Sequence, residues 1–126
     1  VGKMNFLKGR LLDARRADVQ GAALELGEPI ELGQGAALTV CLRPEDVVVR
    51  DLGNGRANVL DAQVGVMEFI GNHFSTVMHV SGTGLSFSAD LSMNAVRDLN
   101  IVAGRPVKVC LPPDRLRVFP EPPAAA

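Results

Sequence analysis

The sequence predicts an all-β protein with one short helix, folded as small Greek-key barrels built from two repeated halves. Three observations lead to this fold class. A unit of strand, proline corner and strand occurs twice, short stretches of alternating polarity are separated by glycine-rich turns, and only one segment has helical spacing. In a chain of 126 residues, we expect residues 1–120 to form one domain and residues 121–126 a flexible tail.

The repeat occupies residues 35–49 and 104–118, which read GAALTVCLRPEDVVV and GRPVKVCLPPDRLRV. In each copy a strand of alternating polarity is followed by a proline. The proline ends the strand because it lacks an amide donor and has a fixed φ. An acidic residue then suits the opening of a turn, and a second strand leaves in a new direction. When the two copies are aligned without a gap, six pairs of residues are identical: Gly35–Gly104, Val40–Val109, Cys41–Cys110, Leu42–Leu111, Pro44–Pro113 and Val49–Val118.

The residues before the first unit predict three strands, at 4–12, 20–26 and 29–32. A polar turn at 14–18 separates the first two, and glycines punctuate the others. Within the first unit, Pro44 ends the strand and the chain resumes as a strand at Val47–Val49. This spacing of short strands is typical of a small barrel.

The middle of the chain predicts a long strand at residues 59–70. Gly65 near its centre indicates a bulge of the kind that lets a small barrel close. The pair Gly71-Asn72 suits a turn with positive φ, and return strands follow at 74–80 and 85–90.

The only convincing helix covers residues 92–99. Ser92 or Asp90 can cap its start, and Met93, Val96 and Leu99 lie along one side. The second repeat unit follows this helix.

Glu68 stands out on the long strand because it shares a face with Val64 and Ile70, which we expect to be buried. Either the carboxylate pairs with a basic residue such as Arg43, or the strand inverts its alternation at Gly65 or leaves the core there for a partner surface.

Composition excludes several classes of function. With 47% hydrophobic and 21% charged residues the chain is neither disordered nor membrane-spanning, and a formal charge of −1 argues against binding nucleic acid through a general positive field. No phosphate loop or nucleophile elbow is present, so we expect no enzyme activity. Cys41 and Cys110 are expected to be reduced, half-buried core thiols of a cytoplasmic protein, and His73 and His79 surface residues without a metal.

Four segments together resemble a known family. They are VGKMNFL at the start, LRPEDV at 42–47, V-x-x-x-E-x-x-G-N at 64–72 and LPPDRLxVF at 111–119. They are similar to the C-terminal region of ATP-binding subunits of bacterial ABC importers, in the maltose, polyamine, iron and phosphonate group. In that family the region is called the TOBE domain, a barrel of OB type built from segments of both halves.

The resemblance implies a non-catalytic regulatory and dimerisation domain. In the family, ATP and Mg²⁺ bind a preceding nucleotide-binding domain, so this stretch needs no cofactor. The chain opens at Val1 without an initiator methionine, and we expect it to be a fragment of such a subunit. The implied partners are a second copy, the membrane permease through the preceding domain, and in some members a regulatory protein. The implied location is the cytoplasmic side of the inner membrane.

The residues that match the family motifs most closely are the candidate contacts for a partner or effector. They lie at the first corner and at the end of the long strand: Arg43, Pro44, Glu45, Glu68, Gly71 and Asn72.

Two other classes of function were weighed. Related barrels in molybdate transport bind small oxyanions near a helix start, and residues 91–109 have a comparable layout, but the Ser/Thr-Arg-Asn signature expected of such a binder is missing. An OB barrel that binds nucleic acid needs exposed aromatic platforms, whereas this chain has no Trp or Tyr and five Phe. We therefore expect no nucleic-acid partner, and the oxyanion sensor is the alternative to the regulatory domain.

Overall fold

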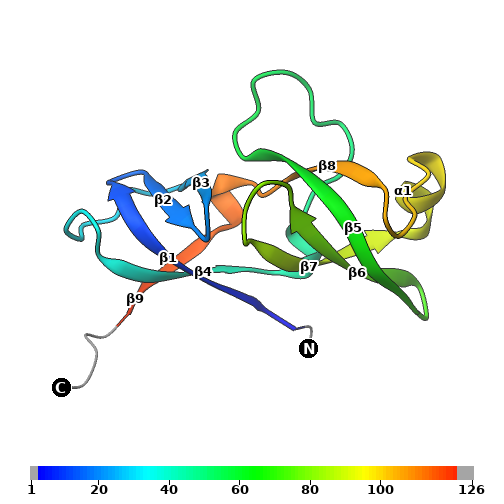
Figure 1. The fold of residues 1–126 in the computed structure, drawn as a ribbon, viewed down its shortest axis with the longest axis horizontal. Helices are drawn as coiled ribbons and strands as arrows, with labels where there is room; N and C mark the ends of the chain where they lie inside the picture. Colours follow the sequence, from blue (N-terminus) through cyan, green and yellow to red (C-terminus); the bar gives the residue numbers. More distant parts are fainter. Residues whose placement is uncertain (1–2, 122–126) are drawn as a thin grey trace.

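The computed structural model describes residues 3–121, which form two β-sheets joined side by side with one short helix at the far end (Figure 1). The first sheet has the order β3-β2-β1-β4-β9 and the second the order β7-β6-β5-β8. All neighbouring strands are antiparallel. The predicted class, all-β with one short helix, is confirmed.

The elements alternate between strands and tight turns. The first sheet contains β1 (Asn5–Asp13), β2 (Arg16–Val19), β3 (Ala22–Glu25), β4 (Ala37–Leu42) and β9 (Arg117–Pro120). The second contains β5 (Val59–Ile70), β6 (His73–Val80), β7 (Ser86–Ser92) and β8 (Pro106–Cys110). The helices are α1 (Met93–Asp98) and the single 3-10 turns η1 (Pro44–Asp46) and η2 (Pro113–Arg115), one at each proline corner.

The two sheets have the same topology, so the repeat extends well beyond the two corner units. In each, three strands form a meander and the fourth strand returns to pair with the first: β4 with β1, and β8 with β5. We call β1–β4 the first lobe and β5–β8 the second lobe. Each lobe is a half-barrel of OB type.

Each lobe is completed by the segment that follows the other lobe's corner. After η2 the chain crosses to the first lobe, where β9 pairs with β4 and Arg117 lies opposite Cys41. After η1 the chain crosses to the second lobe, where Val48 and Cys110 exchange backbone hydrogen bonds of 3.0 and 2.7 Å. The two contacts are equivalent positions of the repeat, because Cys110 lies 69 positions after Cys41 and Arg117 lies 69 positions after Val48. The lobes are therefore interlocked.

A pair of asparagines adds a second reciprocal link. Asn5, at the start of β1, donates from Nδ2 to the carbonyl of Ser88 in β7 and accepts from the Ser88 N–H, both at 2.8 Å. Asn58, just before β5, makes the same two bonds to Glu25 in β3, at 2.8 and 2.7 Å, and also donates to the carbonyl of Leu111. Each side chain therefore fastens the first strand of one lobe to the third strand of the other.

A single apolar core runs through both lobes and joins them into one unit. Cys41 and Cys110 are free, as predicted, but they are fully buried instead of half-buried, and burial raises the pKa of both thiols. Glu121, placed in the predicted tail, is instead anchored by its backbone N–H to Ala37 and by its carboxylate to Thr39 and Lys8. Residues 122–126 of that tail lie outside the described residues.

The predicted element boundaries fail mainly in the first lobe. The polar turn expected at 14–18 is shorter, because β2 already begins at Arg16. The strand expected from Gln20 begins at Ala22, since Gln20 and Gly21 form a turn with φ of 53° and 103°.

Two further predicted strands are not strands. Residues 29–32 are held as a loop by one bond from the Ile30 N–H to the Ala14 carbonyl, at 2.7 Å. Val47–Val49 makes only the single bridge at Val48, because it crosses the second sheet at its edge instead of running along it.

The middle of the chain follows the sequence closely. β5 covers residues 59–70 as predicted, and its pairing with β6 shifts register between Val64 and Met67, which confirms the bulge at Gly65. Gly71 has φ of +67°, as its turn requires. The helix α1 lies within the predicted range, and its cap is Ser92, whose hydroxyl accepts from the Ala95 N–H at 3.0 Å.

Replacing Asn58 should loosen the interlock more than replacing Asn5. Because Asn58 has φ of 58°, Asn58→Gly is the suitable change, and it leaves three backbone groups without their partner. We expect a loss of about 2–4 kcal/mol in the free energy of unfolding, measured by urea denaturation, and about 1–2 kcal/mol for Asn5→Ala, which is less buried. Losses below about 0.5 kcal/mol for both would contradict a structural role for these links.

Gly65→Ala should destabilise the protein mainly through its contact with His79. Gly65 has no positive φ, but a Cβ there would lie 2.8 Å from His79 Nε2 and 3.2 Å from the Val77 carbonyl. We expect a loss of about 1–2 kcal/mol in thermal or chemical denaturation, most of it recovered by adding His79→Ala. His79→Ala alone is the control. An equal loss with and without the histidine would show that the bulge itself requires glycine.

Candidate functional site

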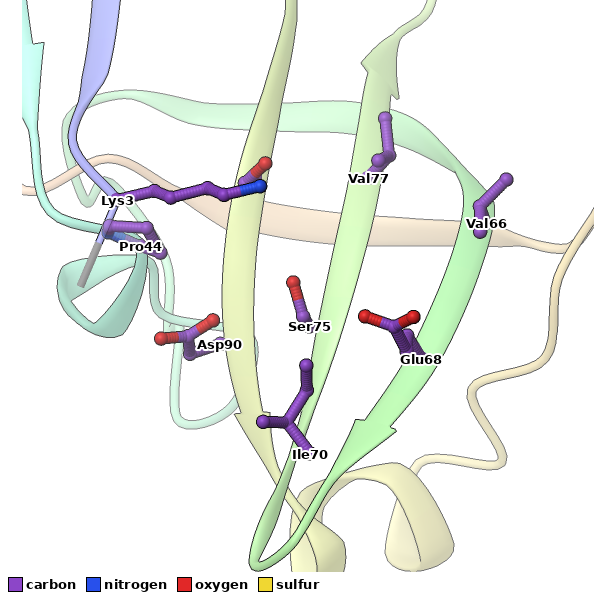
Figure 2. Close-up of a pocket in the computed structure, with 9 residues that line it drawn as sticks. Lys3, Pro44, Val66, Glu68, Ile70, Ser75, Val77 and Asp90 are labelled. Carbon is purple, nitrogen blue, oxygen red and sulfur yellow. The ribbon is translucent and has the colours of Figure 1, made fainter.

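A groove on the outer face of the second lobe brings together residues from five elements of the chain (Figure 2). Its volume is about 340 Å³. Its walls come from β5, β6, β7, the first proline corner and the N-terminal segment. The lining residues are Lys3, Pro44, Val66, Glu68, Ile70, Ser75, Val77, Ser88 and Asp90.

Glu68 reaches this groove because of the bulge in β5. Before the bulge, Asp61 and Gln63 point to solvent while Ala62 and Val64 are buried. The extra residue at the bulge reverses the alternation, so that Glu68 and its neighbours two residues away point outward. Of the interpretations of Glu68, the inverted alternation at Gly65 is therefore the one observed. The suggested pairing with Arg43 is wrong, because no ion pair joins them among residues 3–121.

The first corner places Pro44 at the edge of the groove. The Asp46 N–H donates to the Arg43 carbonyl at 3.0 Å and closes the single turn of η1. Pro44 is buried at the start of this turn, where η1 packs against β7, whereas Arg43 and Glu45 are exposed. The corner thus contributes one apolar wall, and its two charged residues face solvent outside the groove.

The turn Gly71-Asn72 lies beyond the groove, at the tip of the β5–β6 hairpin. The Asn72 N–H donates to the Ile70 carbonyl at 2.6 Å, and its side-chain oxygen lies 2.8 Å from His73 Nδ1. Neither residue of the turn lines the groove. Of the six predicted site residues, the structure therefore brings together two, Pro44 and Glu68.

The polar residues that sequence reasoning missed are Lys3, Ser75, Ser88 and Asp90. Figure 2 shows the Asp90 and Glu68 carboxylates on either side of Ser75, with the Lys3 side chain lying across β7. Asp90 is also 3.8 Å from His73 Nε2. A search for outward positions on β6 and β7 would have found three of them, but Asp90 had been considered only as a helix cap.

The chemistry of this groove suits binding rather than catalysis. Two carboxylates, two hydroxyls and the ammonium group of Lys3 line it together with the apolar side chains of Val66, Ile70 and Val77. Within residues 3–121, no group of three or more His, Cys, Asp or Glu side chains is placed to hold a metal ion. An apolar floor with a few charged groups at its rim is typical of a surface that recognises another polypeptide.

The second proline corner forms an equivalent but different hollow. It is lined by Arg15, Glu25, Leu26, Gly27, Pro113 and Asp114. Gly27 takes the place that Asp90 has in the second lobe, and a Cβ on it would lie only 2.6 Å from the Pro113 carbonyl oxygen. The backbone therefore packs tightly at this corner, whereas the first corner stands beside an acidic side chain.

Two curated proteins are similar to most of this chain. The sulfate/thiosulfate import ATP-binding protein CysA 2 of Chromobacterium violaceum is 33% identical over 121 residues, which cover 95% of this chain and 32% of that protein. The Fe(3+) ions import ATP-binding protein FbpC 2 of Rhizobium meliloti is 32% identical over 119 residues, which cover 79% of this chain and 30% of that protein. The chain thus spans about a third of the length of these relatives.

A solved structure shares the fold. The cytoplasmic molybdate-binding protein ModG, with molybdate bound, matches with a TM-score of 0.76 over 93% of this chain and 96% of that chain. The two sequences are 17% identical, so the likeness concerns the fold alone.

A family model described as the TOBE domain matches residues 40–119. The matched range begins in β4 and ends in β9, so it contains both proline corners, the whole second lobe and every residue that lines the groove except Lys3. The chain belongs to the TOBE domain family.

Proposed function

We propose that this chain is the non-catalytic regulatory and dimerisation region of the ATP-binding subunit of an ABC importer. The observation that carries the proposal is the similarity to two import ATP-binding proteins along most of this chain, within a family-model match that covers both corners. The ATP and Mg²⁺ chemistry would belong to a nucleotide-binding domain elsewhere in the subunit. The permease would be contacted through that domain.

The interlocked lobes support this role physically. A domain that holds two ATPase subunits together has to move as one body, because a soft connection would absorb the displacement. Here each sheet includes a segment from the other half, and two asparagine side chains link the lobes again. The region would lie on the cytoplasmic side of the membrane. Between Lys3 and Glu121, no helix is long and apolar enough to cross a bilayer.

Two kinds of surface would be available to a regulatory partner: the groove and the exposed turns beside it. The groove contains Pro44 and Glu68, while Arg43, Glu45, Gly71 and Asn72 lie outside it on exposed turns. We assign the partner contact to the groove, because it combines an apolar floor with charged groups, whereas the two turns offer only short polar segments.

The alternative function is an oxyanion sensor, and the observation that favours it is the shared fold with a molybdate-binding protein. The charges of the two corner hollows oppose it. The groove contains Glu68 and Asp90 against the one cation Lys3, and the hollow at the second corner contains Glu25 and Asp114 against the one cation Arg15. Carboxylates repel an oxyanion, which prefers amide and hydroxyl donors or basic side chains.

Sedimentation velocity tests dimerisation. We expect the isolated chain to self-associate weakly, with a weight-average sedimentation coefficient that rises between low and high micromolar concentration, because the ATPase half would normally add to the interface. A single monomeric species at every concentration would count against dimerisation as its main role.

Calorimetry separates the two functions. Titration of the protein with molybdate, sulfate and a phosphonate should give no heat beyond dilution, since the hollows carry carboxylates. Saturable binding of one anion in a fixed ratio would instead establish the sensor.

A further inference from the structure

The strand β5 is paired along only half of its outer edge. Its partner β8 covers Val59 to Gln63, and the last hydrogen bonds on that side join Val64 to Gly104 and Arg105, at 2.7 and 2.9 Å. From there to Ile70, no strand within residues 3–121 lies on that edge. We call residues 66–70 the open edge.

The open edge is rich in exposed apolar side chains. Val66 is 73% exposed, Phe69 53% and Ile70 45%, and Val102, in the turn that precedes β8, is 46% exposed. Unpaired strand edges with exposed apolar residues are sites at which another chain adds a strand, and soluble proteins normally protect them with charge or cover them. The one charge on this edge is Glu68, so its chemistry decides which chain can be added.

In the paired half of β5, a carboxylate on the outer face has a cationic partner on the neighbouring strand. Asp61 lies on the outer face directly opposite Lys108 of β8, and its Oδ1 is 2.7 Å from the Lys108 Nζ. Glu68 points to the same face farther along the strand, beyond the end of β8. Among the described residues it has no ion-pair partner, and Asp90 adds a second negative charge to the same groove, against the one positive charge of Lys3.

We propose that the open edge binds an extended segment of another protein by adding it as a strand beside β5. This assignment deepens the regulatory role proposed above, since it specifies the partner's chemistry. Backbone hydrogen bonds hold the segment. On its outer face a lysine or arginine lies opposite Glu68, between two apolar residues that pack beside Val66 and Ile70. On its other face, apolar residues cover Phe69.

A second copy of this chain fits the edge less well. Antiparallel pairing of two open edges about their centre would place Glu68 opposite the same residue of the partner, and like charges directly opposite each other oppose pairing. The acidic groove therefore favours a basic segment over self-pairing.

The probe is the acetylated and amidated peptide Thr-Val-Ile-Lys-Ile-Val-Thr, which reads the same in both directions and so fits either strand orientation. A matched peptide has glutamate in place of lysine. In a heteronuclear NMR titration of the whole chain, the lysine peptide should shift the amide signals of residues 66–70. It should bind at least about fivefold more tightly than the glutamate peptide, as expected for one cross-strand charge pair.

Two variants test whether Glu68 causes the preference for the lysine peptide. Glu68→Lys should reverse the preference between the peptides with little change in melting temperature, because Glu68 is exposed. Asp61→Ala, which removes a carboxylate from the same strand where β8 already covers the edge, should leave the preference unchanged.

Equal binding of the two peptides, shifts confined to other strands, or no shift at millimolar peptide would overturn the proposal. Concentration-dependent protection of residues 66–70 without peptide would assign the edge to a second copy instead. None of these results tests the proposed importer role, which is tested by the sedimentation and calorimetry experiments.

Discussion

The structure depends on the exchange of segments between two lobes of the same topology. A half-barrel of four strands leaves its fourth strand unpaired on one side, and each lobe covers that side with the segment beyond the other lobe's proline corner. Cys41 meets Arg117 in one lobe, and Cys110 meets Val48 in the other. Neither sheet is complete without the other half of the chain. The proline corners are what make the exchange possible, because each ends a strand and turns the chain toward the opposite lobe.

The groove is a product of the same exchange. Pro44 belongs to the corner of the first lobe, whereas Glu68 and Asp90 belong to strands of the second. They meet because the chain crosses between lobes at η1, which packs against β7. A partner bound in this groove would therefore touch both halves at their junction. That position suits a regulator, since a partner held at the junction would act on both lobes of a domain that moves as one body.

The sequence predicted local features well and reciprocal pairing poorly. The two corners, the exact span of β5 and the bulge at Gly65 follow from proline, glycine and alternating polarity, which act within a few residues. The exchange between lobes could not be predicted, because no local pattern states which strand Val48 or Arg117 will join. The asparagine links were missed for the same reason. Of the groove residues, the sequence predicted only Pro44 and Glu68. Lys3, Ser88 and Asp90 come close to Glu68 only through the pairing of strands in the sheet, which no local pattern predicts.

The bulge connects the fold to the proposed interaction. Without the extra residue, the regular alternation of β5 would turn Glu68 into the core, where an unpaired carboxylate is strongly unfavourable. With it, the strand keeps its inner face apolar through Met67 and presents Glu68 outward beside Val66. The bulge also coincides with the point where β8 ends, so the strand changes its alternation where its edge becomes free. A carboxylate needed only for solubility could stand on any exposed turn. Its position on an unpaired edge, between apolar neighbours and opposite no cation, is better explained by recognition of a basic strand.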